Sequence, residues 1–316
     1  MSRNLTAAQR HMLSDAEAIW AQQLPSLRLA ASSAGGMQWK QAKGRDYLIR
    51  HWNDRVSGKK RSVSLGVRTP KTERLYAAFL SDRRQADEAT SAIEAELSDF
   101  REMAKALRLP RLPSVVTDVM RWFAIAGIDR ELAICSHHVL FAYGANGGVQ
   151  FDASRGDLGA LELLVVGHDL DGMQDGLAEA VFSAARGARY EHDRFIVERA
   201  AGDVAIIPRS INQVLFHLRS AQRWDERREE VLREAFELDP ILSVCIGDDG
   251  GPTPMTAVHP KALLCLAISL DNDPALTEEL GEFALDQQIP FDAHEFEAFP
   301  ELGLLIGDPS EESPRF

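Results

Sequence analysis

The pattern of hydrophobic and polar positions divides the chain into three stretches. Between residues 37 and 68 apolar and polar side chains alternate, and this period of two is typical of β-strands. From residue 71 to about residue 107 apolar positions recur at helical spacing but are diluted by charge, which predicts one long helix that packs in a helical pair or bridges domains. After residue 114 short apolar runs alternate with helical patterns, so we expect an α/β core with a mixed sheet.

Turn and capping residues set the borders of the first two stretches. Gly44 and Ser57-Gly58 interrupt the alternating stretch and predict a β-hairpin or a meander. Thr69-Pro70 supplies an N-cap and a first helical residue for the long helix, and Pro110 and Pro113 end it.

Beyond residue 114 the chain is expected to form a further series of elements. In chain order, these are a helix at 115–126, a strand at 132–135, a helix at 138–143, a strand at 161–166, a helix at 170–185, a hairpin of 195–199 and 204–208, a helix at 223–236, a hairpin of 242–246 and 255–258, and a helical tail at 260–288.

These elements indicate four segments. Residues 1–36 contain a weak helix around residues 7–23 and a linker of small residues at 30–36. The other segments are the basic β-hairpin with the long helix at 37–113, the core at 114–210, and a mainly helical C-terminal region with a β-hairpin at 211–316.

The net charge of −13 conceals an asymmetry. Residues 1–113 hold 20 Lys and Arg against 12 Asp and Glu, a balance of +8, whereas the remainder holds 15 against 36, a balance of −21. Such a split indicates two surfaces with different partners, or two parts that attract one another.

Residues 39–71 carry the strongest binding signal. They hold ten Lys and Arg against two Asp and Glu, interleaved with Trp39, Tyr47 and Trp52, which is typical of a surface that follows phosphates and stacks bases. Two other interpretations stay open: the aromatic side chains pack on the long helix, or the basic face docks on the acidic half of the same chain or of a partner protomer. The candidate nucleic-acid contacts are Lys40, Lys43, Arg45, Arg50, Lys59, Lys60 and Arg61.

Other features narrow the class of protein. No run of 18 apolar residues and no signal-peptide core occur, so we expect a cytoplasmic protein without a membrane partner. Cys135, Cys245 and Cys265 are odd in number, far apart and set in apolar runs, which predicts buried thiols and excludes a disulfide framework or a cysteine zinc site. The sequence also lacks a phosphate-binding loop, a dinucleotide fingerprint and a nucleophile elbow.

Several runs of residues resemble a known family. The runs are WKQAKGRDYL at 39–48, SLGVRTPKTE at 64–73, CSHHVLFAY at 135–143, GVQFD at 148–152, GALELL at 159–164, IGDDG at 246–250 and HPKA at 259–262. In order and spacing they resemble a poorly characterised bacterial branch of the DNA polymerase β-like nucleotidyltransferase superfamily, over roughly residues 37–290. The resemblance implies an α+β or α/β fold, with a nucleotidyltransferase-like mixed sheet and flanking helices.

The resemblance also implies a site for two divalent metal ions. Members of the superfamily place two carboxylates at i and i+2 of one strand and a third on the next strand, and these positions fall here on Ala160, Glu162 and Ala205. The Gly-Ser or Gly-Thr turn that holds the triphosphate becomes Cys135-Ser136. A triphosphate brings about four negative charges, and a metal-free pocket with one glutamate offers nothing to offset them. We therefore expect a catalytically degenerate member that acts as a binding or regulatory module, with no confident cofactor.

Two alternative functions stay open. In the first, the metal ligands are a shifted carboxylate set of Asp157, Glu162 and Asp203, and the protein is an active, toxin-like nucleotidyltransferase. This enzyme would need Mg²⁺ and an NTP, and Ser136 and His137 would contact the nucleotide. In the second, the protein binds nucleic acid through the basic hairpin. Each function leaves room for a protein partner or a homodimer.

Four groups also have structural explanations. Glu162 in an apolar strand predicts either an ion pair with an arginine or a residual role in a pocket. His137-His138 diverge by about 100° on a helix, which favours a polar helix start over shared metal ligation. His168-Asp169 is expected in a loop that caps the next helix, and residues 248–251 in a hairpin turn rather than a calcium loop.

Overall fold

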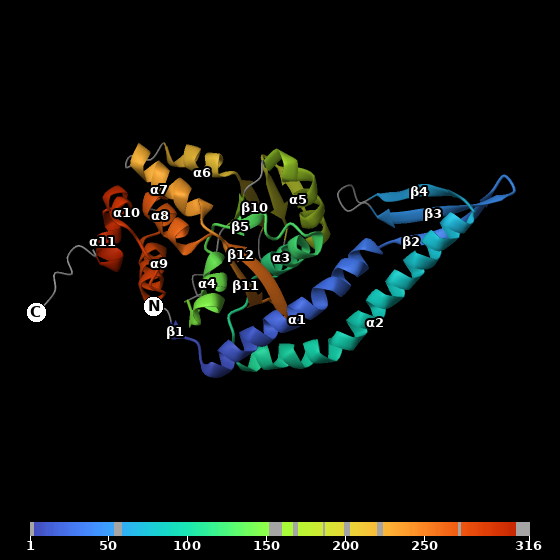
Figure 1. Ribbon diagram of the computed structural model, residues 1–316, viewed down its shortest axis with the longest axis horizontal. Helices are drawn as coiled ribbons and strands as arrows, with labels where there is room; N and C mark the ends of the chain where they lie inside the picture. Colours follow the sequence, from blue (N-terminus) through green and yellow to red (C-terminus); the bar gives the residue numbers. More distant parts are fainter. Residues whose placement is uncertain are drawn as a thin grey trace, which may run out of the picture.

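The chain consists of a body around one mixed sheet and an arm that carries a second sheet at its far end (Figure 1). A computed structural model describes residues 3–53, 59–151, 160–166, 170–185, 187–198, 203–219, 224–270 and 273–307.

The arm is a helical pair with a meander at its tip. Helices α1 (Ala7–Ser32) and α2 (Pro70–Ala106) pack along each other, and the chain between them forms an antiparallel sheet in the order β2-β3-β4. These strands are β2 (Gly36–Ala42), β3 (Arg45–Asn53) and β4 (Lys60–Val67). The predicted meander and long helix are both confirmed.

Local sequence explains the borders of these elements. The hydroxyl of Thr69 accepts a hydrogen bond from the backbone N–H of Thr72, and Pro70 occupies the first turn of α2, as predicted. Lys43 and Gly44 turn β2 into β3 with φ angles of 53° and 70°, a left-handed conformation that glycine adopts at little cost.

Helix α1 is longer than predicted. It continues through Pro25, so its last turn includes the first residues of the linker expected at 30–36. The helix packs on α2 and on α3 (Ser114–Ala126), where Arg28 donates hydrogen bonds of 3.1 and 2.7 Å to the carbonyl oxygen of Ala124. These tertiary contacts offset the weak local helix signal.

The body is built on a seven-stranded mixed sheet in the order β11-β12-β5-β7-β10-β9-β8. Strands β7 and β10 run parallel, as do β12 and β5, and the other neighbours run antiparallel. The strands are β5 (Leu132–Ile134), β7 (Leu161–Val165), β8 (Arg189–Glu191), β9 (Arg194–Val197), β10 (Val204–Arg209), β11 (Ile241–Ile246) and β12 (Pro252–Ala257). Separately, β1 (Arg3–Asn4) pairs with β6 (Val149–Gln150).

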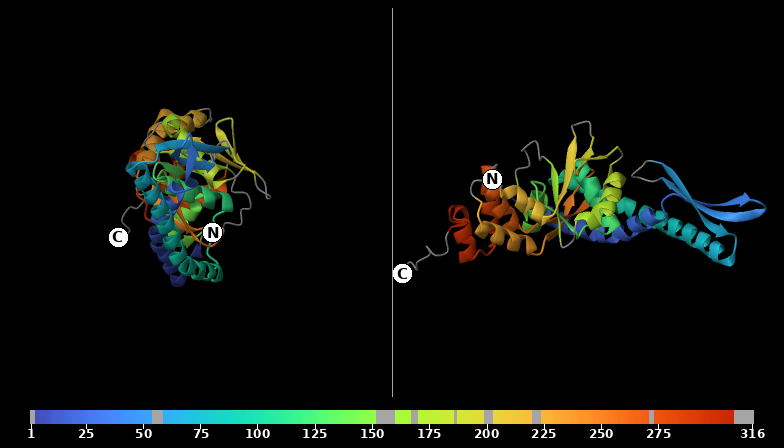
Figure 2. Two further views of the ribbon diagram at one scale, coloured as in Figure 1. Left: turned by 90° about the vertical axis from the view of Figure 1, so that its right-hand side faces the viewer. Right: turned by 90° about the horizontal axis from the view of Figure 1, so that it is seen from above.

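Helices flank this sheet, and the C-terminal ones gather at the end of the body opposite the arm tip (Figures 1 and 2). Besides α3 they are α4 (Val139–Gly147), α5 (Leu170–Ala184), α6 (Ile211–Leu218), α7 (Glu226–Glu237), α8 (Pro260–Leu270), α9 (Pro274–Asp286), α10 (Ala293–Ala298) and α11 (Glu301–Ile306). Within the described ranges, no helix combines the length and the apolar character needed to cross a membrane.

Several short helices and strands were not predicted from the sequence. Strand β8 and helices α6, α10 and α11 have between 3 and 8 residues, too few to establish a period. The helical tail expected at 260–288 is two helices, α8 and α9.

One hydrophobic core crosses the border expected at residue 210. Strand β12 pairs with β5, and one cluster of buried side chains extends from Leu112 to Leu302. The segments 114–210 and 211–316 therefore form one body rather than two parts.

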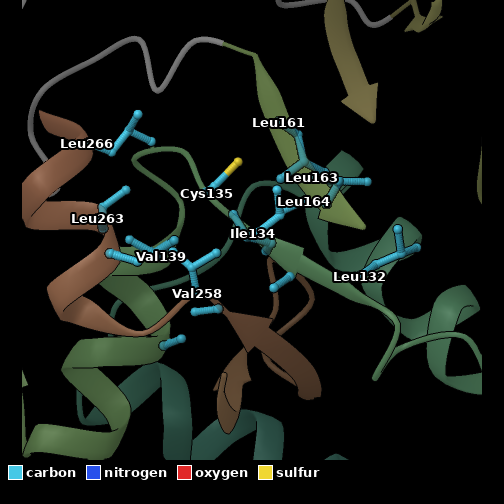
Figure 3. Packing of buried hydrophobic residues seen from close by; sticks show 14 of the residues in the cluster. Leu132, Ile134, Cys135, Val139, Leu161, Leu163, Leu164, Val258, Leu263 and Leu266 are labelled. Carbon is cyan, nitrogen blue, oxygen red and sulfur yellow. The ribbon is translucent and has the colours of Figure 1, made fainter. Parts of the chain in front are cut away.

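The end of β5 lies deep in this core. Figure 3 shows Ile134 and Cys135 between side chains of β7 and of α8, among them Leu161 and Leu263. All three cysteines are free and buried, as predicted, and burial raises the pKa of the Cys265 thiol to about 12.

Asp249 connects the arm helix α2 to the body. It lies in the turn between β11 and β12, which confirms the predicted hairpin turn. Its carboxylate oxygens accept hydrogen bonds of 2.9 and 2.8 Å from Arg121 on α3, and Nη2 of Arg101 on α2 donates to Oδ2 at 3.4 Å. Burial alone would raise the pKa of Asp249, but the two arginines and the backbone N–H of Gly251 lower it to about 2.

Asp249→Asn is expected to lower the free energy of unfolding by about 1 kcal/mol at pH 7, since the carboxylate is 40% exposed and solvent weakens its ion pairs. Because the pKa is about 2 in the folded chain and ordinarily 3.8, this contribution is complete above pH 3.8 and is lost as the pH falls through 2. Urea unfolding at pH 7 and at about pH 2.5 measures it, and the difference from the parent chain should shrink at the lower pH.

The neighbouring substitution Asp248→Asn, at an exposed residue, is the matched control and should change stability by less than about 0.5 kcal/mol. An effect of Asp249→Asn that is equal at both pH values would contradict the assignment.

Candidate functional site

The ends of β7 and β10 bring together the positions that the resemblance assigns to metal ligands. Ile207 on β10 lies opposite Glu162 on β7 in a parallel register. Because side chains alternate along a strand, Ala205 lies on the face of Glu162 and beside Ala160, which directly precedes β7. Glu162 is the one carboxylate among these three positions.

Glu162 is paired with a cation of its own chain. Arg209 lies two residues after Ile207, hence on the same face, and its Nη2 is 3.7 Å from Oε1 of Glu162. The side chains of Arg209 and Glu162 are 25% and 35% exposed, so the pair is partly shielded from solvent. This is the arginine ion pair that the sequence left open, and a guanidinium at this place repels a divalent cation.

The two described members of the shifted carboxylate set, Glu162 and Asp203, do not lie together. Asp203 precedes Ile207 by four residues, which places it about 13 Å from the level of Glu162 at about 3.3 Å per residue. Its Oδ2 instead accepts a hydrogen bond of 3.3 Å from Arg189. Asp157 lies outside the described residues, as do His168 and Asp169.

The residues present do not fit two catalytic metal ions. In the part of the chain that the structure describes, no three His, Cys, Asp or Glu side chains form a group that could hold a metal ion. The described part of the site therefore offers one carboxylate, already paired, where the chemistry needs three.

The hydroxyl of Ser136, a predicted nucleotide contact, is used within the protein. It accepts a hydrogen bond of 3.3 Å from the backbone N–H of Glu162 and shares a hydrogen bond of 3.1 Å with Nδ1 of His138. Burial, and then the neighbouring His137, lower the pKa of His138 to about 4, so the imidazole is neutral at neutral pH. Ser136 thus joins the end of β5 to β7.

His137, the other predicted nucleotide contact, joins the same loop to α9. Its Nε2 lies 3.0 Å from Oδ2 of Asp273, whose Oδ1 caps α9 by accepting a hydrogen bond from the backbone N–H of Leu276. Among the described residues that line the neighbouring cavity, His137 and Gln150 are the polar ones, and neither offers a fixed positive charge to a triphosphate. The cavity is otherwise lined by Leu5, Leu13, Leu109, Pro110, Leu140, Phe141, Gly144, Ala145, Val149, Phe151, Cys245 and Ile246.

One face of the β2–β4 meander packs on the arm helix. Leu48, on the central strand, is fully buried and lies opposite Trp39. The Trp39 ring makes an edge contact with Tyr76 of α2 at 5.9 Å between ring centroids, and the guanidinium of Arg68 lies 5.1 Å from the Trp39 centroid. The interpretation in which the aromatics pack on the helix therefore holds for Trp39.

The opposite face, here called the open face, is basic. Residues paired across strands share a face, and Tyr47 pairs with Lys40, Arg45 with Ala42, and Asn53 with Lys60. The open face thus carries Gln38, Lys40, Ala42, Arg45, Tyr47, Ile49, His51, Asn53, Lys60, Ser62, Ser64 and Val67, a set without Asp or Glu.

The register divides the predicted nucleic-acid contacts into two groups. Lys40, Arg45 and Lys60 lie on the open face, with Lys43 in the β2–β3 turn and Lys59 directly before β4. Arg50 and Arg61 lie instead on the face of Leu48, and Nη2 of Arg50 donates a hydrogen bond of 2.8 Å to the carbonyl oxygen of Ser32. The sequence analysis missed Gln38, Ser62 and Ser64, although their two-residue spacing from Lys40 and Lys60 signals the same face.

The open face does not dock on the acidic C-terminal part of the same chain. The meander lies at one end of the molecule and helices α7 to α11 at the other, in both side views (Figures 1 and 2). This arrangement separates the open face from the acidic helices α7 to α11.

Compared with known proteins, the chain matches no family model, no curated protein and no solved structure. The function of the chain is therefore inferred from the geometry of its described residues.

Proposed function

We propose that this chain is a nucleic-acid-binding protein whose nucleotidyltransferase-like body is catalytically degenerate. The open face of the meander carries the proposal, since Lys40, Arg45 and Lys60 are exposed there and no Asp or Glu among the described residues of β2, β3 and β4 lies on that face. Phosphate backbones bind such faces through lysine and arginine, with release of counterions.

The length of the arm makes this binding feasible for an acidic protein. Helix α2 has 37 residues and spans about 55 Å at 1.5 Å per residue. The Debye length is about 10 Å at 0.1 M salt, so the negative charge of the distant C-terminal region is screened at the arm tip.

The body supports a role without catalysis. Arg209 lies 3.7 Å from Glu162, and the hydroxyl of Ser136 makes hydrogen bonds with Glu162 and His138. A body of this kind serves as a binding or regulatory module, and the bound nucleic acid is the ligand we assign to the chain.

Two measurements on the full chain test the proposal. Fluorescence anisotropy is expected to show binding of labelled nucleic acid at about 50 mM salt. Calorimetry is expected to show no binding of any of the four NTPs with Mg²⁺ or Mn²⁺, because the carboxylates that would hold the metal are replaced or paired.

Each measurement has a contrary outcome. Absence of nucleic-acid binding at about 50 mM salt would overturn the nucleic-acid assignment. Metal-dependent binding of an NTP would overturn the loss of catalysis and favour the shifted carboxylate set.

A further inference from the structure

We propose that the open face of β2–β4 binds in the major groove of duplex DNA. This inference rests on the proposed nucleic-acid-binding function and names its ligand. It depends on the order of side chains across the face, on where the aromatic residues point, and on the width of the sheet.

The charged side chains lie at the two ends of the open face. Lys60 lies at one end, opposite Asn53, and Lys40 lies near the other, opposite Tyr47, with Arg45 and the turn residue Lys43 beyond it. Asn53 and Tyr47 are six residues apart, so the ends are separated by about 20 Å at about 3.4 Å per residue. With the strands lying along the groove, each charged end of the face reaches the phosphates that border the groove at its own level.

The hydrogen-bonding side chains of Gln38, Ser62 and Ser64 lie between the charged ends, beside Ile49 and His51. Gln38, Ile49 and Ser64 form one row across the three strands, and His51 lies opposite Ser62 in the next row. Phosphate contacts position a protein on DNA while base edges carry the sequence, and glutamine and serine both bond base edges in the major groove. The face therefore has phosphate-binding groups at its two ends and base-recognition groups between them.

The dimensions of the meander suit the groove. Three strands at about 4.8 Å spacing place the axes of β2 and β4 about 10 Å apart. The major groove of B-DNA is about 12 Å wide and about 8.5 Å deep and admits β-strands, whereas the minor groove is about 6 Å wide.

The placement of the aromatic residues disfavours single strands. Stacking on aromatic rings supplies about 1 to 3 kcal/mol per base in single-strand binding. Trp39 is covered by Tyr76 and Arg68, and Trp52, although 37% exposed, lies on the face of Leu48. Of Trp39, Tyr47 and Trp52, Tyr47 alone lies on the open face. Duplex RNA is disfavoured as well, because its major groove is too deep and narrow for side chains to read.

The first test compares nucleic acids with the full chain. We expect at least tenfold tighter binding to a DNA duplex than to either of its single strands or to the RNA duplex of the same sequence. A DNA duplex whose cytosines carry glucosylated hydroxymethyl groups at C5, which fill the major groove only, should bind at least tenfold more weakly.

The second test uses matched variants. The triple variant K40A/R45A/K60A should lose at least about 30-fold in affinity at about 50 mM salt and reduce the salt slope by about 2.7, because each phosphate contact contributes about 0.9. The control K71A/R74A/R84A removes the same charge from exposed positions of α2 and should change the slope by less than about 1. Circular dichroism of both variants verifies that they are folded.

The outcomes separate this inference from the proposed function. Equal or tighter binding to single strands or to duplex RNA, or undiminished binding to the glucosylated duplex, would overturn the major-groove inference and leave a nucleic-acid-binding protein. Binding to none of them would overturn both, and equal losses in the two triple variants would remove the open face from the binding site.

Discussion

The affinity of the chain for duplex DNA is expected to fall about 150-fold when salt rises from about 50 to about 200 mM. Four basic residues on or beside the open face, Lys40, Lys43, Arg45 and Lys60, would each neutralise one phosphate. At about 0.9 per contact, log affinity should fall with log salt with a slope of about −3.6. Anisotropy titrations at several salt concentrations measure this slope.

Single substitutions sharpen the salt test. Lys43→Asn keeps a residue that tolerates the left-handed conformation of the turn and should reduce the slope by about 0.9. Lys105→Gln, in the last turn of α2, is the control and should leave it unchanged. A slope near zero for the parent chain would mean that phosphates contribute nothing to binding.

Phe100→Ala is expected to lower the free energy of unfolding by about 3 to 5 kcal/mol, the second large effect. Phe100 of α2 is 2% exposed and lies in a second hydrophobic cluster where α1, α2 and β11 meet, with Met12, Ile19 and Ile246. Truncation of the ring leaves a cavity that the surrounding side chains cannot fill. Urea unfolding followed by circular dichroism gives the difference.

The control for this prediction is an exposed apolar residue. Leu304 on α11 is 90% exposed, and Leu304→Ala should change stability by less than about 0.5 kcal/mol. A loss below about 1 kcal/mol for Phe100→Ala would show that the second cluster contributes little to the junction of arm and body.

The parts of the fold that could be predicted are those with a long local pattern. Thr69 and Pro70 mark the start of α2, and alternation over three strands marks the meander. The pairing of β12 with β5 could not be predicted, because Ala257 and Ile134 are more than 100 residues apart and no local period records their contact. One sheet and one hydrophobic core therefore cross the border expected at residue 210.

The candidate sites follow the same rule. Glu162 was conspicuous as a carboxylate in an apolar strand, but its partner Arg209 depends on the parallel register of β7 and β10. In the meander, seven basic residues were predicted from composition to form one nucleic-acid-binding surface. The strand register and the burial of Leu48 assign Arg50 to the helix side and Lys40 to the open side.

The two arm helices leave and re-enter the body next to each other. Helix α1 carries the chain out to the meander, α2 carries it back, and the helices pack along each other. The meander is thus a terminal loop of a helical hairpin, and its length, sequence or specificity can change while the core of the body keeps all its contacts. The meander at the tip and the body can therefore evolve independently, as two modules of one polypeptide.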